Sequence, residues 1–188
     1  LESLRNAGTK ETQLNDALLA AHKAWRNAAQ TLRIERLRAA DALSETVTGL
    51  LAELGMAGGR FAVELEDNPE SLPQSHGLER CEFMVSANPG QPLRALRKVA
   101  SGGELARISL AIEVATLGSD PVPTMVFDEV DAGIGGAVAE TVGRKLRALG
   151  GRCQVLAVTH LAQVASFGNR HLRVAKQTDG EATESQVI

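Results

Sequence analysis

The first 54 residues contain no proline and are rich in alanine, leucine, arginine and glutamate, which constrains the fold more than any other feature. Such a segment predicts one long helix. The helix carries an apolar stripe in steps of four and three, at Leu14, Leu18, Ala21, Trp25, Ala28 and Leu32. The stripe falters at Glu35 and resumes as Leu43, Val47, Leu50 and Leu54. This pattern fits either a helix packed on its own domain or one arm of an antiparallel coiled coil whose other arm lies outside the chain.

The composition fits one soluble globular domain, because the 188 residues are 44% hydrophobic and 23% charged with a formal net charge of -3. No run of about 18 apolar residues occurs, so we expect no membrane-spanning segment. The two cysteines, Cys81 and Cys153, indicate free thiols in a cytoplasmic protein rather than a disulfide framework. The chain begins at Leu1 without a signal peptide, which indicates a piece of a longer protein.

Beyond the long helix the pattern changes, starting with a break at the glycines 55, 58 and 59. Alternating apolar residues predict strands over 61–65 and 80–87, joined as a β-hairpin by a long loop that contains Pro69 and Pro73. Helices and strands then alternate to about residue 176, and a short strand is expected over 186–188. This alternation predicts an α/β fold with a parallel sheet that is flanked by helices and buried on both faces.

Two acids follow the predicted strand that ends with Phe127. Asp128 and Glu129 therefore stand at the carboxyl end of a strand, the edge of an α/β sheet where ligands bind. A buried carboxylate there needs a cation, and Mg²⁺ with a nucleotide phosphate would supply one. The second acid could polarise a water for attack on phosphorus. Taken alone, an Asp-Glu pair is more often a solvated strand end.

A helix start is predicted at Ser101, because Ser101 and Glu104 have the spacing of a capping box. The apolar face of that helix would comprise Leu105, Ile108, Ile112 and Ala115. Gly102 and Gly103 leave the backbone N–H groups open at the helix N-terminus, which favours an anion. The alternative is an ordinary capped helix, although paired glycines cost stability early in a helix.

A histidine ends the third apolar segment, Val155 to His160. A lone histidine is usually structural. This one is predicted at the same sheet edge as Asp128 and Glu129, which favours a role as a phosphate sensor or hydrogen-bond partner.

Several kinds of site are absent from the sequence. No Gly-Lys dipeptide occurs, so the chain lacks a P-loop. The four histidines have no metal-binding spacing with each other or with the cysteines. No G-x-S-x-G elbow is present, and the glycines at 133, 135 and 136 lack the third position of a dinucleotide-binding loop.

Three segments together carry a specific resemblance: KVASGGELARISLAIEVA (98–115), MVFDEVDAGIGG (125–136) and VTHLAQVASFGNRHLRVAK (158–176). Their order resembles the signature loop, Walker B strand, D-loop and histidine switch in the C-terminal half of an ABC-type ATPase head. Within that class the chain is most similar to the RecN family of SMC-like DNA repair ATPases. The resemblance implies a returning coiled-coil arm over 1–54 and the C-terminal half of a head over 55–188.

The resemblance also assigns roles by position. Asp128 would hold Mg²⁺, Glu129 would be the general base, and His160 would contact the γ-phosphate of ATP. Asp131 would belong to the D-loop, which communicates across a dimer of heads. The signature residues Ser101, Gly102, Gly103 and Glu104 would bind the ATP held by the opposite subunit.

The resemblance implies ATP hydrolysis coupled to a homodimer of heads, in DNA double-strand break repair and recombination near the nucleoid. The family's P-loop lies in an N-terminal head lobe, so that lobe is an expected partner and the chain alone should be inactive. Basic residues could contact DNA through its phosphates, at Arg94, Arg97 and Lys98 and on the arm at Arg33, Arg36 and Arg38. Taken singly, each of these residues is more often part of a solvated charged face. The alternative function is an ATP-gated DNA tether in which hydrolysis is secondary. A transporter subunit and an interaction module that lost its P-loop fit less well.

Overall fold

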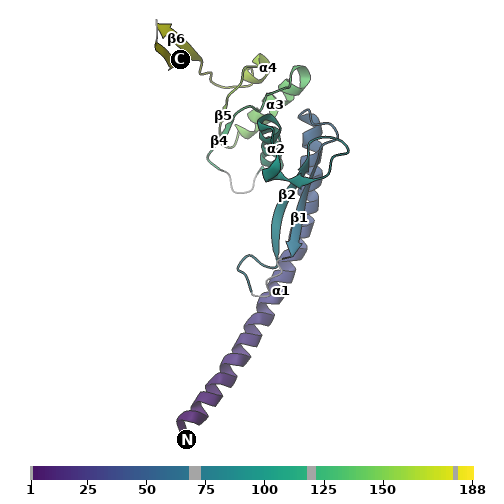
Figure 1. The fold of residues 1–188 in the computed structure, drawn as a ribbon, viewed down its shortest axis with the longest axis vertical. Helices are drawn as coiled ribbons and strands as arrows, with labels where there is room; N and C mark the ends of the chain where they lie inside the picture. The colour runs from purple at the N-terminus through teal and green to yellow at the C-terminus, as the bar shows by residue number, and fades with distance from the viewer. Residues whose placement is uncertain (1, 68–72, 118–121, 180–181) are drawn as a thin grey trace.

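The computed structural model describes residues 2–67, 73–117, 122–179 and 182–188. Its elements are α1 (Glu2–Glu53), β1 (Arg60–Asp67), β2 (Glu79–Ser86), β3 (Arg94–Ala95), the 3-10 helix η1 (Leu96–Lys98), α2 (Gly102–Ala115), β4 (Thr124–Phe127), α3 (Gly136–Leu149), β5 (Gln154–Ala157), α4 (Ala162–Ala165), β6 (Val174–Asp179) and β7 (Ala182–Val187). Figure 1 shows α1 as a long rod whose N-terminal part projects away from the other elements. At 1.5 Å per residue, its 52 residues extend about 78 Å.

The two halves of α1 have different surroundings. Leu14 and Leu18 are 63% and 55% exposed, whereas Trp25, further along the same stripe, is half-buried. Ala28 is also exposed, and the neighbouring Ala29 is buried instead. In the last turns the predicted stripe is confirmed, because Val47 and Leu54 are completely buried. The helix therefore ends as a core element and begins as an unpartnered arm.

The predicted hairpin is confirmed as an antiparallel sheet with the strand order β1-β2-β3. The structure adds the two-residue β3, which is too short for a sequence pattern to reveal. The part of the predicted loop around Pro69 lies outside the described residues. The outer edge of β1 is covered by α1, because the Thr48 hydroxyl accepts from the Phe61 N–H and donates to the Phe61 carbonyl. The Ser44 hydroxyl, one turn earlier, accepts from the Val63 N–H at 3.0 Å.

The parallel sheet consists of β4 and β5 in the described part of the chain. Met125 and Phe127 pack toward the core, whereas Val126 and Leu156 are 66% and 45% exposed. The prediction that both faces are buried was therefore wrong. Helices cover one face of the strand pair, and the apolar residues of the other face stay open to solvent.

The main core forms where α1, α2 and α3 meet the sheets. Its largest fully buried side chains are Leu51, Leu54, Ile108, Leu110, Leu149, Val47, Val130 and Val142. The predicted apolar face of α2 is correct at Ile108 but wrong at Leu105, which is 38% exposed. The buried face of α2 instead includes Leu110 and Ala111.

The C-terminal segment forms an antiparallel hairpin of β6 and β7, rather than the single short strand predicted over 186–188. Its alternating pattern is weak, because the strands are mostly polar. None of the described helices is both long enough and apolar enough to cross a membrane.

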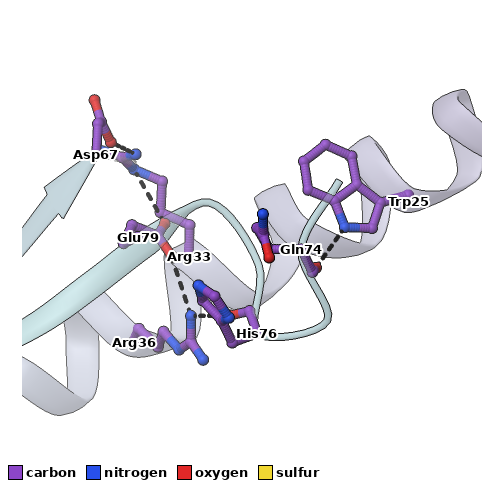
Figure 2. A network of polar contacts seen from close by, with 7 residues as sticks. All are labelled: Trp25, Arg33, Arg36, Asp67, Gln74, His76 and Glu79. Carbon is purple, nitrogen blue, oxygen red and sulfur yellow. Dashed lines mark hydrogen bonds and ion pairs between the residues drawn. The ribbon is translucent and has the colours of Figure 1, made fainter. Parts of the chain in front are cut away.

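Glu79 ties the start of β2 to α1 (Figure 2). Its side chain is completely buried, and its two oxygens lie 3.2 Å from Arg36 Nη1 and 3.6 Å from Arg33 Nε. Arg33 also pairs with Asp67 at the end of β1. On the same face of α1, the Trp25 indole N–H donates to the Gln74 carbonyl.

These contacts correct the expectation that Arg33, Arg36 and Arg38 form a basic patch for DNA. Arg33 and Arg36 are held by the hairpin acids, and Arg38 pairs with Glu35 at 2.6 Å. Arg33 and Arg36 therefore fasten the hairpin to the arm rather than form a basic surface, whereas Arg38 stays exposed beside Glu35 on the same helix.

We expect Glu79→Gln to loosen the hairpin, because it removes the buried charge that pairs with Arg36 and leaves Arg33 with Asp67 alone. The local opening free energy of β1 and β2 should fall by about 2 kcal/mol, seen as roughly 30-fold faster amide hydrogen exchange. Glu35→Gln is the matched control, since its carboxylate is exposed and should contribute less than about 0.5 kcal/mol. Equal exchange rates in the two variants would contradict the assigned role of Glu79.

Candidate active site at the carboxyl edge of the parallel strands

The predicted meeting of the two strand ends is confirmed. β4 and β5 run parallel with Phe127 opposite Ala157, and the Val158 N–H donates to the Phe127 carbonyl at 2.9 Å. Asp128 follows β4 directly. His160 lies three residues beyond the end of β5 rather than at its end, so the predicted strand over 155–160 is shorter than expected. The loops that carry Asp128 and His160 thus leave the same edge of the sheet.

The acids differ in burial. Asp128 and Glu129 are exposed, whereas Asp131 is 3% exposed. The exposure of the first two agrees with the solvated strand end that an Asp-Glu pair more often forms, because the outer face of β4 is open in the described structure. The Asp128 carboxylate accepts a hydrogen bond from the Glu129 N–H at 2.9 Å.

Glu129 has a φ of 56°, the only positive value for a non-glycine residue in the described chain. This left-handed conformation costs about 1–2 kcal/mol for an ordinary residue. The Glu129 carbonyl accepts from the Ala132 N–H at 3.0 Å, which closes a tight turn over residues 129–132. The strained residue is thus the proposed general base itself.

Asp131 joins this turn to the loop after β5. Its Oδ2 accepts from the Thr159 hydroxyl and from the His160 N–H, and it lies 3.5 Å from His160 Nδ1. Burial by itself raises the pKa of Asp131. The hydrogen bonds from Thr159 and His160, with the charge of His160, outweigh burial and hold that pKa below its ordinary value. Inside this chain Asp131 therefore fixes the position of the histidine loop.

The predicted cap of α2 is confirmed, because the Ser101 hydroxyl accepts from the Glu104 N–H at 3.3 Å. The two glycines that follow lie directly against the 129–132 turn. A Cβ on Gly102 would collide with the Glu129 carboxylate, and a Cβ on Gly103 would lie 2.9 Å from the Ala132 Cβ. The glycines therefore let the helix start approach the turn, and Gly103 is buried there.

The structure places two further residues at this site that we did not predict, Arg107 and Thr159. Arg107 Nη1 donates to the Ala132 carbonyl at 2.8 Å. Helical spacing offered a signal for Arg107, since it lies three and four residues before the buried Leu110 and Ala111. Thr159 had no comparable signal, because its partner Asp131 is 28 residues away.

The donor set fits Mg²⁺ held together with a nucleotide phosphate. No group of three or more histidine, cysteine or acidic side chains suited to a metal ion occurs in the described residues. Mg²⁺ is commonly held by one or two carboxylates while phosphates and waters complete its shell. The exposed carboxylate of Asp128 suits that arrangement, and the N-terminus of α2 offers N–H groups to an anion.

Comparison with curated proteins identifies the relatives of the chain. The DNA repair protein RecN of Xylella fastidiosa (strain Temecula1) is 54% identical over 187 residues, which cover 100% of this chain and 34% of that protein. The chain is homologous to the C-terminal part of RecN. RecN of Vibrio cholerae is 47% identical over 162 residues, covering 86% of this chain and 29% of that protein. The chain therefore spans about a third of the length of these RecN relatives. No protein-family model matches it.

Solved structures place the fold among SMC heads. The Smc head domain of Pyrococcus furiosus, solved with an extended coiled coil and bound to the C-terminal domain of ScpA, superposes with a TM-score of 0.53. It is 23% identical, and the superposition covers 81% of this chain and 36% of that one. The Smc head of Pyrococcus yayanosii gives a TM-score of 0.54 at 23% identity, covering 81% and 28% of the two chains. The expected ABC-type α/β head fold is thereby confirmed.

We expect Thr159→Val to raise the pKa of Asp131, because it removes a donor that favours the ionised form. A depressed folded-state pKa contributes stability above the unfolded-state pKa, and this contribution is lost as pH falls through the folded-state pKa. In the variant the loss should therefore begin at a higher pH. Carbon NMR of the labelled Asp131 carboxyl measures the shift, with Thr141→Val on α3 as the control. An unchanged Asp131 pKa would refute the assigned hydrogen bond.

Proposed function

We propose that the chain is the C-terminal lobe and arm root of an SMC-like ATPase that acts in DNA double-strand break repair and recombination. One observation carries the proposal. The acids after β4 and the histidine loop after β5 share one sheet edge, with the start of α2 packed against them, in a chain 54% identical to a RecN protein. Such an edge suits transfer of a phosphoryl group to water.

Each predicted site residue then has a role that suits its position. Asp128 would hold Mg²⁺, which would neutralise charge on the phosphates when bound. Glu129, exposed beside Gly102, would accept the proton of the attacking water. His160, held by Asp131, would contact the γ-phosphate. The helix start at Ser101, Gly102, Gly103 and Glu104 would face the ATP of a second head.

The chain offers two surfaces for the rest of the protein. The bare face of β4 and β5, with Val126 and Leu156 exposed, suits an N-terminal head lobe that carries the P-loop. A groove of about 370 Å³ between α2 and β4 reaches from Glu113 to Asp128 along the same side. The leucines of the free part of α1 suit a returning coiled-coil helix. A homodimer would then form through the heads.

The proposal includes contact with DNA. Arg94 and Lys98 are exposed just before α2. Arg97, between them, pairs with Glu82 at 3.5 Å but stays 68% exposed. We propose that these cations approach DNA phosphates, so that binding is sequence-independent and weakens with salt. The protein would then act in the cytoplasm at the nucleoid.

We expect Glu129→Gln in the full-length protein to lower ATP turnover at least about 100-fold, because it removes the general base. ATP-dependent dimers should persist, since ATP binding does not need the base. Steady-state ATPase assays and light scattering measure the two properties, with Glu140→Gln on α3 as the control. Loss of the dimers with ATP still bound would argue against this role.

The same variant separates the alternative function, an ATP-gated tether. If Glu129→Gln keeps full DNA bridging and repair activity, hydrolysis is secondary and the tether describes the protein better. If bridging persists but repair fails, the hydrolytic cycle is required.

We also expect the 188-residue chain to show no ATP hydrolysis by itself, because it has no P-loop lysine. Adding the N-terminal segment of the same protein should restore activity, and that activity should be lost with Glu129→Gln. Substantial hydrolysis by the chain alone, dependent on Glu129, would mean that the site is complete without a second lobe.

A further inference from the structure

Arg107 is a buried charged group that the proposed chemistry does not use. It lies on α2 and is 8% exposed. Its Nη1 donates to the Ala132 carbonyl at 2.8 Å, while its Nε is buried without a hydrogen-bond partner among the described residues. Burial lowers the pKa of the guanidinium, and the nearby Glu104 opposes that effect. The positive charge of Arg107 is therefore buried with one hydrogen bond among the described residues, to the Ala132 carbonyl.

This arrangement is a poor way to stabilise a helix. A buried cation without a paired carboxylate loses its hydration, and one carbonyl replaces only part of it. An apolar side chain of similar length at this position would fill the same space without that cost. Stabilisation of α2 thus does not explain why an arginine is buried at position 107. The position of its hydrogen-bond partner, the Ala132 carbonyl, offers a better explanation.

The partner carbonyl belongs to the residue that closes the turn begun by Glu129. The Ala132 N–H bonds back to the Glu129 carbonyl, and Glu129 holds its left-handed φ of 56° inside this turn. A strained conformation persists only where its surroundings determine it. On the opposite side Asp131 fastens the turn to the histidine loop. Arg107 supplies the side-chain hydrogen bond from α2.

We propose that Arg107 is a positioning residue that fixes the turn over residues 129–132 and so keeps the Glu129 carboxylate at the sheet edge. The inference rests on the proposed function in one respect, that Glu129 is the general base. Only one N–H donor at the end of a long side chain is needed, because the structure uses a single bond to one carbonyl. Lysine should therefore replace Arg107 in part, and methionine should not.

The test compares Arg107→Met and Arg107→Lys in the full-length protein, with Arg144→Met as the matched control. Arg144 is an exposed arginine on α3 that pairs with Glu140. We expect Arg107→Met to lower kcat for ATP by about 10- to 100-fold, because a displacement of about 1 Å can cost about 100-fold. KM should stay within about threefold and Tm should not fall, since a positioning residue acts on the reaction step. Arg107→Lys should recover most of kcat.

A second measurement examines the turn without ATP turnover. The Ala132 amide closes the turn by bonding to the Glu129 carbonyl, and the Ile134 amide, just after the turn, bonds to the Asp131 carbonyl. Their hydrogen exchange should be at least about tenfold faster in Arg107→Met than in the control, and near the unsubstituted rate in Arg107→Lys.

Three results would overturn the inference. These are an unchanged kcat in Arg107→Met, a Lys variant as inactive as the Met variant with a lowered Tm, or unchanged exchange of the two amides. Failure of the proposed function has a different signature, since Glu129→Gln would then leave turnover intact. In that case the exchange rates alone still decide whether Arg107 holds the turn.

Discussion

The burial of the last turns of α1 is the constraint on which the rest of the structure depends. Val47, Leu51 and Leu54 belong to the same hydrophobic core as α2 and α3, although they end a helix about 78 Å long. The same turns present Ser44 and Thr48 to the edge of β1. The arm is therefore continuous with the core rather than attached by a linker, and its direction is set by core packing and by the Glu79 contacts.

Charged groups at the sheet edge divide into two classes by burial. Asp128 and Glu129 are exposed, which suits the ligand contacts proposed for them. Asp131 and Arg107 are buried and bonded to the backbone of neighbouring loops. Low surrounding polarity strengthens such bonds and makes an unpaired group costly, so buried charges fix geometry better than exposed ones. The turn that carries Glu129, the proposed general base, is thus held by the buried neighbours Asp131 and Arg107.

Local patterns predicted much of this fold, and tertiary pairing explains the remainder. The helix break at Gly55, the cap at Ser101 and the shared edge of Asp128 and His160 all follow from spacing within a few residues or from the geometry of parallel strands. The burial of Asp131 and the open face of β4 do not, because they depend on contacts between distant segments. Arg107 had a periodic signal, but charged residues are rarely expected on a buried face.

The prediction of a basic patch on the arm failed for a different reason. Three arginines are close together in the sequence, at positions 33, 36 and 38, and this spacing predicts a cluster of positive charge. The hairpin returns Asp67 and Glu79 to the same place, and Glu35 lies one turn from Arg38. The partners of Arg33 and Arg36 lie 34 and 43 residues away, so local sequence could not show that these two cations are paired.

The two hydroxyls that α1 presents to β1 have a consequence for assembly. An uncovered strand edge can pair with any extended segment, including a wrong one from the same chain or another copy. Here the backbone groups of Phe61 and Val63 are already bonded to a helix, so the sheet cannot grow on that side. The closure would also favour correct assembly with the proposed N-terminal lobe, because one edge for mistaken strand pairing is removed before the two segments meet.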